Sequence, residues 1–221
     1  ANGAQALFAV CQSSEMQSLS LEERVALATF TAERVKGRVP VVASGHVSDS
    51  LDAQRHELTA LVDTGIDGIV LVTNRLATQD DSAEIFRHHL DALLVALPTE
   101  MPLGLYECPA PFRRLLSDDC GVFNNIHPDL YRWLADHGDR HPAFAEELAT
   151  FLVLAAQTEP MGYPKLAKRY HQRIGTLNSD HSRVIDFDIR ERFWGVEPVI
   201  DRLLQGTEHY RARIRELMAT A

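Results

Sequence analysis

Cysteines and long apolar runs are scarce in this 221-residue sequence. Its three cysteines, Cys11, Cys108 and Cys120, form no Cys-x-x-Cys pair and are too few for a disulfide scaffold, so we expect a cytoplasmic location. No stretch approaches the ~20 apolar residues of a membrane span, so no membrane partner is expected. The start at Ala1 resembles neither a signal peptide nor an initiator methionine, and we expect the true N-terminus to lie upstream.

Positive charge is also in short supply, with 22 Lys and Arg residues against 31 Asp and Glu residues and a net charge of -9 at pH 7. A surface of this sign repels phosphate backbones and anionic lipid at long range. Nucleic acid is therefore not an expected partner. The content of 45% hydrophobic and 24% charged residues is that of an ordinary globular protein with one core.

The ten histidines show no metal-binding spacing. His88 and His89 are adjacent, and adjacent side chains on a helix point about 100° apart. His127, His137 and His141 include no His-Glu-x-x-His arrangement. We therefore expect no metal site.

Four short apolar runs recur along the first half of the chain, with helical patterns between them. They are LFAV from Leu7, VPVVA from Val39, GIVLV from Gly68 and PLGLY from Pro102. This alternation of strand and helix predicts an α/β fold with a parallel sheet. Because the runs are apolar almost throughout, we expect a sheet that is covered on both faces.

Helix-end signals define three helices between these runs. Ser20 and Glu23 form a capping box at the start of the first helix, and Gly37 ends it. The second helix is expected from about Ser50 to Asp63, and the third from Asp81 to Pro98.

The regular pattern fails after the fourth run. Another strand-like run, GVFNNI from Gly121, follows Tyr106 across a segment with two prolines and one short helical turn, whereas a parallel crossover usually contains a full helix. We therefore expect a segment to be missing near residues 119–120, at the join Asp119-Cys120. Residues 1–128 then carry the strands, and residues 129–221 form a C-terminal helical part of the same domain. Its helices are expected at Asp129–His137, Ala143–Gln157, Tyr163–Ile174 and Arg192–Met218, the last interrupted by Gly195, Pro198 and Gly206.

Polar side chains follow each apolar run, at the point where a parallel strand ends and ligands bind. Hydroxyls and amides outnumber charges among them, which suits a small polar ligand such as a carboxylate held by serine hydroxyls and backbone N–H groups. These residues are Cys11 to Glu15, Ser44 to His46, Thr73 to Arg75, Tyr106 and Glu107, and Asn124, Asn125 and His127.

Four strand ends in succession, LFAVCQSSEMQSLSLEER, VPVVASGH, GIVLVTN and PLGLYECP, closely resemble the dihydrodipicolinate synthase and N-acetylneuraminate lyase family. The resemblance covers Leu7 to about Leu116 in register and continues more loosely to about Ile174. It implies an α/β fold of the (β/α)8 TIM barrel type with C-terminal helices, incompletely represented in these residues. It also implies a Schiff base between a lysine and pyruvate or another 2-oxo acid, no metal or organic cofactor, and a homo-oligomer, either a dimer or a tetramer.

The same resemblance assigns candidate site residues. The stretch from Cys11 to Glu15 lies on the family's G-[ST]-T-G-E loop, which binds the oxo-acid carboxylate and begins a proton relay. Tyr106 lies on the tyrosine of the family's Y-N-x-P motif, which moves protons to and from the substrate. The implied catalytic residues are Tyr106 and Ser13, and the implied substrate-binding residues are Gln12, Ser13, Ser14 and Asn124.

Departures from the family pattern narrow the expected activity. Cys11 and Ser14 replace loop glycines, and Gln12 replaces the first hydroxyl. Pro111 and the stretch Asn74-Arg75-Leu76 stand where synthases of lysine biosynthesis carry an arginine and a tyrosine pair. We therefore do not expect the lysine-synthase activity itself.

Simpler interpretations stay open for the same residues. The stretch from Cys11 to Glu15 is compatible with a polar loop before a capped helix, and Tyr106 with a packing residue whose hydroxyl bonds a carbonyl. Glu107 is compatible with a solvated or arginine-paired rim residue. The successive strand ends favour the functional interpretation.

The Schiff-base lysine is not among the 221 residues. The sequence contains only Lys36, Lys165 and Lys168, none of which ends a strand, so we expect the nucleophile in the segment missing between Asp119 and Cys120. The prediction is a carbon–carbon or carbon–oxygen lyase, either an aldolase or a dehydratase. The alternative is a non-catalytic, small-acid-binding or inactive member of the family. A third hypothesis is a complete chain with an open five-stranded sheet.

Overall fold

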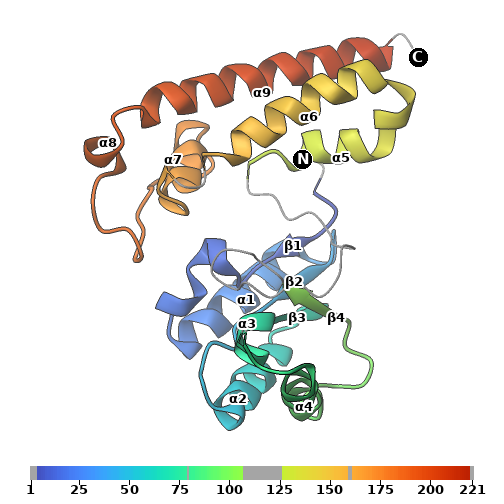
Figure 1. Cartoon of the computed structure of the whole chain (residues 1–221), viewed down its shortest axis with the longest axis vertical. Helices are drawn as coiled ribbons and strands as arrows, with labels where there is room; N and C mark the ends of the chain where they lie inside the picture. Colours follow the sequence, from blue (N-terminus) through green and yellow to red (C-terminus); the bar gives the residue numbers. More distant parts are fainter. Residues whose placement is uncertain (1–3, 79, 107–125, 159–160, 220–221) are drawn as a thin grey trace. The chain divides into compact units, whose positions relative to one another are not determined.

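The computed structural model of the protein describes residues 4–78, 80–106, 126–158 and 161–219. It contains two compact units, one formed by residues 5–121 and the other by residues 122–221 together with residues 1–4 (Figure 1). We call them the sheet unit and the helical unit. The predicted gap at Asp119-Cys120 lies outside the described residues, as does the predicted strand Gly121–Ile126 apart from Ile126.

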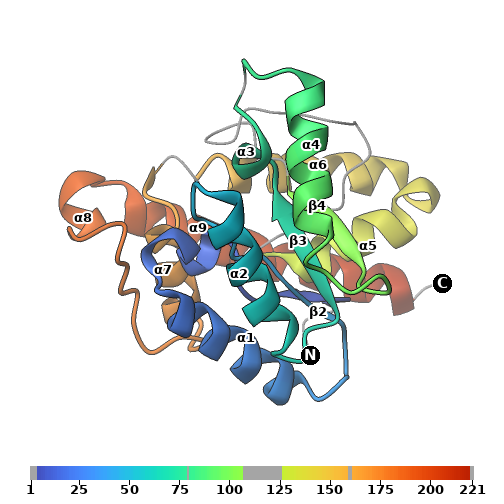
Figure 2. The same ribbon diagram turned by 90° about the horizontal axis from the view of Figure 1, so that it is seen from below.

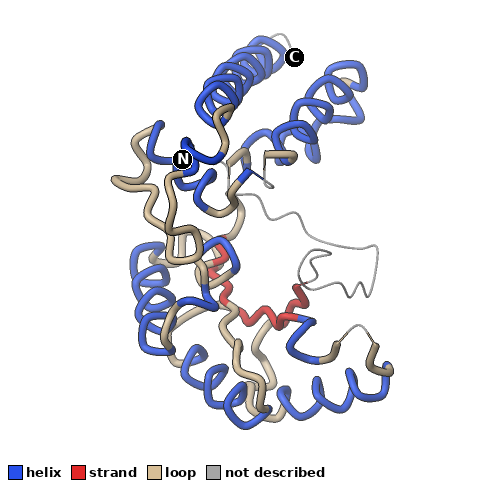
Figure 3. The backbone as a smooth tube through the Cα atoms, turned by 60° about the vertical axis from the view of Figure 1, so that its left-hand side comes forward, coloured by secondary structure: helices blue, strands red, loops and turns tan. Residues whose placement is uncertain are grey.

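The sheet unit is built on four parallel strands that pair in chain order. They are β1 (Leu7–Phe8), β2 (Val41–Ala43), β3 (Gly68–Val72) and β4 (Leu103–Tyr106). The main connecting helices are α1 (Leu21–Val35), α2 (Leu51–Val62) and α4 (Ala83–Leu94). These helices lie side by side in chain order on one face of the sheet (Figures 2 and 3). The predicted alternation of strand and helix is confirmed.

The capping box predicted for the first helix is present. The N–H of Glu23 donates to Ser20 Oγ at 3.3 Å, and the N–H of Ser20 donates to Glu23 Oε2 at 2.9 Å. Two left-handed residues, Lys36 (φ 51°) and Gly37 (φ 67°), follow Val35 and end α1. The second helix also agrees, because Ser50 caps α2 by accepting the N–H of Ala53 at 3.2 Å.

The limits predicted for the third helix are wrong at both ends. Helix α4 begins after Ser82, whose Oγ accepts the N–H of Ile85 at 3.3 Å. Asp81 lies outside the helix because its carboxylate accepts the N–H of Thr78 at 2.7 Å. The helix ends at Leu94 and not at Pro98, since the chain there tightens into turns closed by i to i−3 hydrogen bonds.

Burial differs between the strands of the sheet. All five residues of β3 are buried, as a central strand paired on both sides requires. Strand β4 alternates instead, with Leu103 and Leu105 exposed by 49% and 42%. Among the described residues β4 pairs only with β3, so the predicted burial on both faces is right for β3 and wrong for β4.

The helical unit contains α5 (Pro128–His137), α6 (Pro142–Ala156), α7 (Lys165–Arg173), α8 (Ile189–Arg192) and α9 (Val196–Ala219). The first three agree with the predicted helices to within two residues at each end. The helix predicted over Arg192–Met218 corresponds to α9, and the interruption predicted at Gly195 is confirmed, since Gly195 lies between α8 and α9. Figure 1 shows α9 running without a break alongside α6. None of the helices that the structure describes combines the length and apolar character of a membrane-spanning segment.

Neither Pro198 nor Gly206 interrupts α9, which corrects the prediction. Pro198 lies in the first turn, where a backbone N–H has no helical partner and its loss costs nothing. Gly206 lies in the middle, where a Cβ would be 2.3 Å from Cε2 of Phe151 on α6. The glycine is therefore required by the close approach of two helices and not by a turn.

We predict that Gly206→Ala destabilises the protein. Alanine gains about 1 kcal/mol of helix propensity, but overpacking against Phe151 costs about 1–3 kcal/mol, and a Cβ at 2.3 Å belongs at the upper end of that range. The measurement is urea unfolding followed by far-UV circular dichroism. Gly195→Ala is the control, because a Cβ there meets nothing within 4 Å. Combining Gly206→Ala with Phe151→Leu should recover part of the loss; a Gly206→Ala variant more stable than the natural chain would contradict the packing argument.

Candidate functional site at the strand ends

The loop after β1 is closed by a serine side chain. The N–H of Cys11 donates to Ser14 Oγ at 2.8 Å, and the Ser14 hydroxyl donates to the carbonyl of Cys11 at 2.7 Å. These bonds wrap the chain into two short 3₁₀ turns, η1 (Gln12–Ser14) and η2 (Met16–Ser18). The single proton of the Ser14 hydroxyl is thereby used within the loop.

Glu15 joins the two turns in an unusual conformation. It is 5% exposed and has φ 59° and ψ 41°, in the left-handed region. For a residue with a Cβ this conformation costs about 1–2 kcal/mol. The loop therefore has a specified shape that the surrounding contacts maintain.

Three buried polar atoms at the strand ends have no hydrogen-bond partner among the described residues. They are Gln12 Oε1 after β1, Ser44 Oγ after β2 and Asn74 Oδ1 after β3. The carboxyl ends of neighbouring parallel strands lie at one edge of a sheet, so all three residues belong to the same edge. Leaving such an atom unpaired costs about 1–3 kcal/mol, which a polar ligand would offset.

Tyr106 ends β4 at this same edge. Its ring meets the ring of Phe8 on β1 edge to face, with centroids 5.9 Å apart and planes at 79°. Strands lie about 4.8 Å apart, so β1 and β4 would be roughly 14 Å apart in a flat sheet. The ring contact therefore indicates a sheet curved toward these side chains, as barrel closure requires.

A buried ion pair supports the turn after β2 from the helical side. Arg24 Nη2 of α1 lies 3.0 Å from Glu57 Oε1 of α2, and the two side chains are 5% and 6% exposed. Arg24 Nη1 also donates to the carbonyl of Gly45. Glu57 accepts the N–H groups of Val47 at 2.9 Å and Ser48 at 3.2 Å, and the Ser48 hydroxyl at 2.8 Å. Burial acts to raise the pKa of Glu57, but the hydrogen bonds from Ser48 and Arg24 outweigh it and lower the pKa.

His46 connects this turn to β3. The ring nitrogen Nδ1 lies 2.9 Å from Gln54 Oε1, and Nε2 accepts the N–H of Val72 at 2.7 Å. The second bond requires a lone pair on Nε2, so the ring is neutral and carries its proton on Nδ1. Burial lowers the pKa of His46 to about 4, which agrees with a neutral ring.

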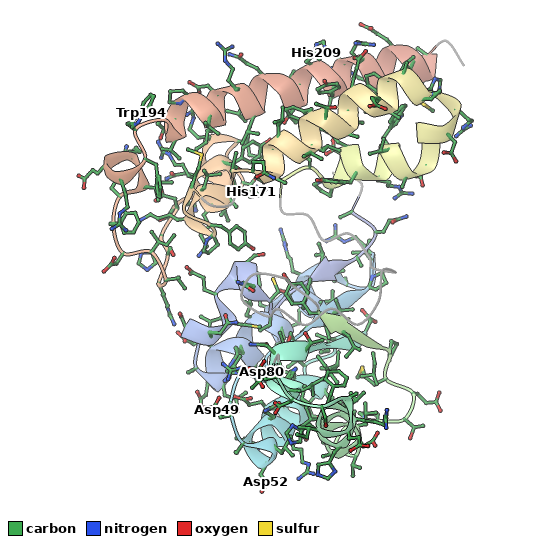
Figure 4. All side chains as sticks on the ribbon, viewed as in Figure 1. Asp49, Asp52, Asp80, His171, Trp194 and His209 are labelled. Atoms are coloured by element: carbon green, nitrogen blue, oxygen red, sulfur yellow. The ribbon has the colours of Figure 1, made fainter. Side chains whose placement is uncertain are left out.

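The stretch after β3 folds as a short helix, α3 (Thr73–Leu76), which was not predicted from the sequence. Thr73 is fully buried, and its hydroxyl donates to the carbonyl of Tyr106 at 3.2 Å. Arg75 instead points outward and forms an ion pair at 2.6 Å with Asp49, which lies on the surface (Figure 4). Such an exposed pair contributes little to stability.

The structure places most of the predicted site residues on the sheet unit. Gln12, Ser13 and Ser14 form η1, and Tyr106 ends β4 at the same edge of the sheet. Asn124, the remaining predicted substrate-binding residue, lies outside the described residues. Their roles stay predictions.

The lysines of the chain have structural roles. Lys36 follows α1 in a left-handed conformation. Lys165 Nζ donates to the carbonyl of Phe187 at 2.7 Å, and Lys168 Nζ donates to that of His181 at 3.1 Å. The last two side chains thus hold the loop before α8 within the helical unit.

Four supporting residues were not predicted from the sequence, namely Arg24, Gln54, Glu57 and Phe8. A signal exists for the first three, because each is a polar residue on the buried side of a helix. Arg24 lies one turn before the buried Ala28, and Gln54 and Glu57 lie beside the buried Leu58. Phe8 carries no such signal, since an aromatic residue in a strand is ordinary.

Comparison with known proteins identifies the family. The chain matches the model of the dihydrodipicolinate synthetase family over residues 1–113. It belongs to this family. The 4-hydroxy-tetrahydrodipicolinate synthase of Bacillus subtilis (strain 168) is 33% identical over 111 residues, which are 49% of this chain and 36% of that protein. The enzyme of the same name from Pseudomonas putida (strain W619) is 32% identical over 110 residues, 49% of this chain and 35% of that protein. The matched part thus spans about a third of the length of these curated relatives.

Solved structures of this family share the fold. Dihydrodipicolinate synthase from Bacillus anthracis superposes with a TM-score of 0.75 at 18% identity, over 90% of this chain and 87% of that one. A prophage protein of the dihydrodipicolinic acid synthase family from E. coli K12, solved with pyruvate, has a TM-score of 0.75 at 17% identity. The match covers 94% of this chain and 88% of that one. A Clostridium difficile protein solved with mannosamine has a TM-score of 0.73 at 13% identity. The match covers 90% of this chain and 87% of that one. The fold is the (β/α)8 barrel with C-terminal helices, incompletely represented in these residues, which confirms the prediction and replaces the open-sheet alternative.

We predict that Arg24→Met destabilises the protein by about 3–5 kcal/mol, because it leaves the Glu57 carboxylate buried and without its cation. Chemical unfolding at pH 7 measures the change. Arg24→Met combined with Glu57→Leu should recover most of the loss, since both charges are then removed. Arg132→Met, which breaks an exposed pair with Asp136 (46% and 47% exposed), is the matched control and should cost less than about 1 kcal/mol. Equal effects at the two sites would contradict the role of the buried pair.

Proposed function

We propose that this protein is a carbon–carbon or carbon–oxygen lyase, an aldolase or a dehydratase, that acts on a 2-oxo acid of the pyruvate type through a lysine Schiff base. The observation that carries the proposal is the gathering of polar side chains at one edge of the sheet, where Gln12, Ser13 and Ser14 form the turn after β1 and Tyr106 ends β4. Among the described residues the buried Ser44 hydroxyl at this edge has no partner and can donate to a substrate oxygen. The family membership of the chain supports lyase chemistry.

In the proposed reaction, a lysine amine attacks the ketone carbon of the substrate, a C–N bond forms and water leaves. The resulting iminium withdraws electrons from the adjacent carbon, so that a C–C or C–O bond can break. This lysine is expected in the segment missing between Asp119 and Cys120. Lys165 and Lys168 are poorly suited to the role, because both amines donate to backbone carbonyls.

The described residues take the other roles. We assign carboxylate binding to Gln12, Ser13 and Ser14 of the η1 turn, and proton transfer to Ser13 and Tyr106. For Ser14 this role requires the hydroxyl to turn from the Cys11 carbonyl to the substrate. The amide of Gln12 supplies an NH₂ donor in place of the family hydroxyl. Asn124 completes the substrate-binding set. No metal or organic cofactor takes part in the proposed reaction.

The second candidate is a member of the family that binds a small acid without turnover. The features that favour it are Cys11 and Gln12, which stand where the family carries a glycine and a hydroxyl, and the absence of a lysine that ends a strand from the 221 residues. The two candidates share the binding site and differ only in the lysine. For either one, we also propose a cytoplasmic homo-oligomer, a dimer or a tetramer.

The Schiff base provides the test. We predict that the full-length protein incubated with pyruvate and borohydride gains one covalent adduct, because reduction makes the iminium irreversible. Peptide mapping should place the adduct on a lysine other than Lys36, Lys165 and Lys168. Absence of an adduct with pyruvate and with a panel of 2-oxo acids, in folded protein, would support the acid-binding candidate. An adduct on one of these three lysines would show that the assignment of the strands is wrong.

The role of Tyr106 gives a second prediction. Tyr106→Phe removes one hydroxyl and keeps the ring on Phe8, so turnover should fall ~10²-fold or more, the usual scale for a positioned acid–base group, while the unfolding free energy changes little. Steady-state kinetics on a 2-oxo acid that forms the adduct measures the effect. Phe8→Leu is the matched control, since it removes the ring contact and keeps the hydroxyl; it should lower stability more than turnover. Full turnover by Tyr106→Phe would remove the hydroxyl from the mechanism.

A further inference from the structure

His46 lies where β2 has ended but β3 continues. Strand β2 pairs with β3 only as far as Ala43 opposite Ile69, whereas β3 extends to Val72. The N–H of Val72 finds its acceptor in the imidazole, at 2.7 Å from Nε2. The His46 side chain thus replaces a strand carbonyl at the end of the sheet, and it does so while 0% exposed.

The residue held by His46 lies directly beside the proposed proton-transfer residue. In the register of β3 and β4, Val72 pairs with Tyr106. The next residue, Thr73, is fully buried and donates its hydroxyl to the carbonyl of Tyr106 at 3.2 Å. Two successive residues, Val72 at the end of β3 and Thr73 at the start of α3, therefore set the backbone position of Tyr106, and the first of them is held by the imidazole.

The other side of the imidazole is equally constrained. Its Nδ1 lies 2.9 Å from Gln54 Oε1, and Gln54 Nε2 donates to the carbonyl of Arg75 at 3.3 Å. Gln54 belongs to α2 and Arg75 to α3, so His46 and Gln54 together tie the end of β3 and the start of the following helix to α2.

We propose that His46 is a positioning residue of this site, whose neutral ring holds the end of β3 so that Tyr106 keeps its place for proton transfer. The proposal rests on the proposed function, because it assigns a purpose to the position of Tyr106. His46 itself touches no substrate in this scheme; it acts through Val72 and Thr73.

Burial and the charged groups around His46 determine the pH range over which its ring is neutral and accepts the N–H of Val72. Glu57 on α2 acts to raise the pKa of the ring, while Arg75 on α3 and Arg24 on α1 act to lower it. Burial is the largest influence and brings the pKa to about 4. The Nε2 acceptor is therefore present throughout the neutral range, and it is lost when the ring is protonated in acid.

A pair of substitutions separates the two bonds of the ring. His46→Asn keeps a donor near Nδ1 for Gln54 but has no atom that reaches Val72, whereas His46→Gln places an acceptor near the position of Nε2. We predict that His46→Asn lowers kcat about 10- to 100-fold, the scale of a small displacement of a reacting group. KM for the 2-oxo acid should change little, because the loop assigned to its carboxylate follows β1. His46→Gln should keep most of the turnover.

Two measurements on the folded protein without substrate accompany the kinetics. In His46→Asn, exchange of the Val72 amide hydrogen should accelerate tenfold or more, and the nuclear Overhauser contact between the rings of Phe8 and Tyr106 should weaken. In His46→Gln both should resemble the natural protein. If the natural protein forms no Schiff base, the proposed function fails while these two measurements still report whether His46 positions Tyr106.

The result that would overturn the proposal is a His46→Asn variant with natural kcat and an unchanged Phe8–Tyr106 ring contact. If that variant does not fold, Thr73→Val tests the contact between Thr73 and Tyr106. This substitution removes the hydroxyl that donates to the Tyr106 carbonyl and keeps the shape of the side chain. A fall in kcat at constant KM would support the proposal. Natural kcat in a folded Thr73→Val variant would overturn it.

Discussion

The buried ion pair between Arg24 and Glu57 is the contact on which the strand-end edge depends. Glu57 accepts the N–H groups of Val47 and Ser48 in the turn after β2, and Arg24 donates to the carbonyl of Gly45 in the same turn. A buried pair of this kind adds little net stability compared with apolar residues of the same size, because both charges must be removed from water. Its contribution is orientation, since Arg24 and Glu57 together bond a carbonyl and two N–H groups of the turn.

The edge of the sheet therefore has two layers of polar side chains with different purposes. Toward the helices, the ionic and amide groups of Arg24, Glu57 and Gln54 bond one another, His46 and the backbone. Beyond the strand ends, Gln12, Ser44 and Asn74 keep buried oxygen atoms that no described residue satisfies. Here the ion pair and amide bonds hold the backbone rigidly, and these oxygen atoms at the strand ends have no partner among the described residues. This arrangement is expected of a site that recognises a polar molecule, because rigidity reduces the entropy lost on binding.

Local signals in the sequence were sufficient for the four strands and the three main helices of the sheet unit, although not for the limits of α4 or for the short helices η1, η2 and α3. The five apolar residues from Gly68 to Val72 predict β3, and Ser20 with Glu23 predicts the start of α1, because each signal acts over a few residues. Contacts between distant residues could not be predicted in this way. The pairing of Arg24 with Glu57 and the approach of Gly206 to Phe151 depend on how two helices meet, which no window of sequence contains. The strand-end residues of the candidate site were found because the carboxyl ends of parallel strands lie at one edge of a sheet, and the family resemblance then assigned roles to some of them.

The contact between Phe8 and Tyr106 has a consequence for how the sheet unit assembles. The two rings belong to the first and the last of its described strands, and β2 and β3 lie between these strands in the sheet. Contacts of such long sequence separation are slow to form, because closing a large loop costs chain entropy. The place of the tyrosine assigned to proton transfer therefore depends on all four strands, and a partly folded sheet would lack this arrangement.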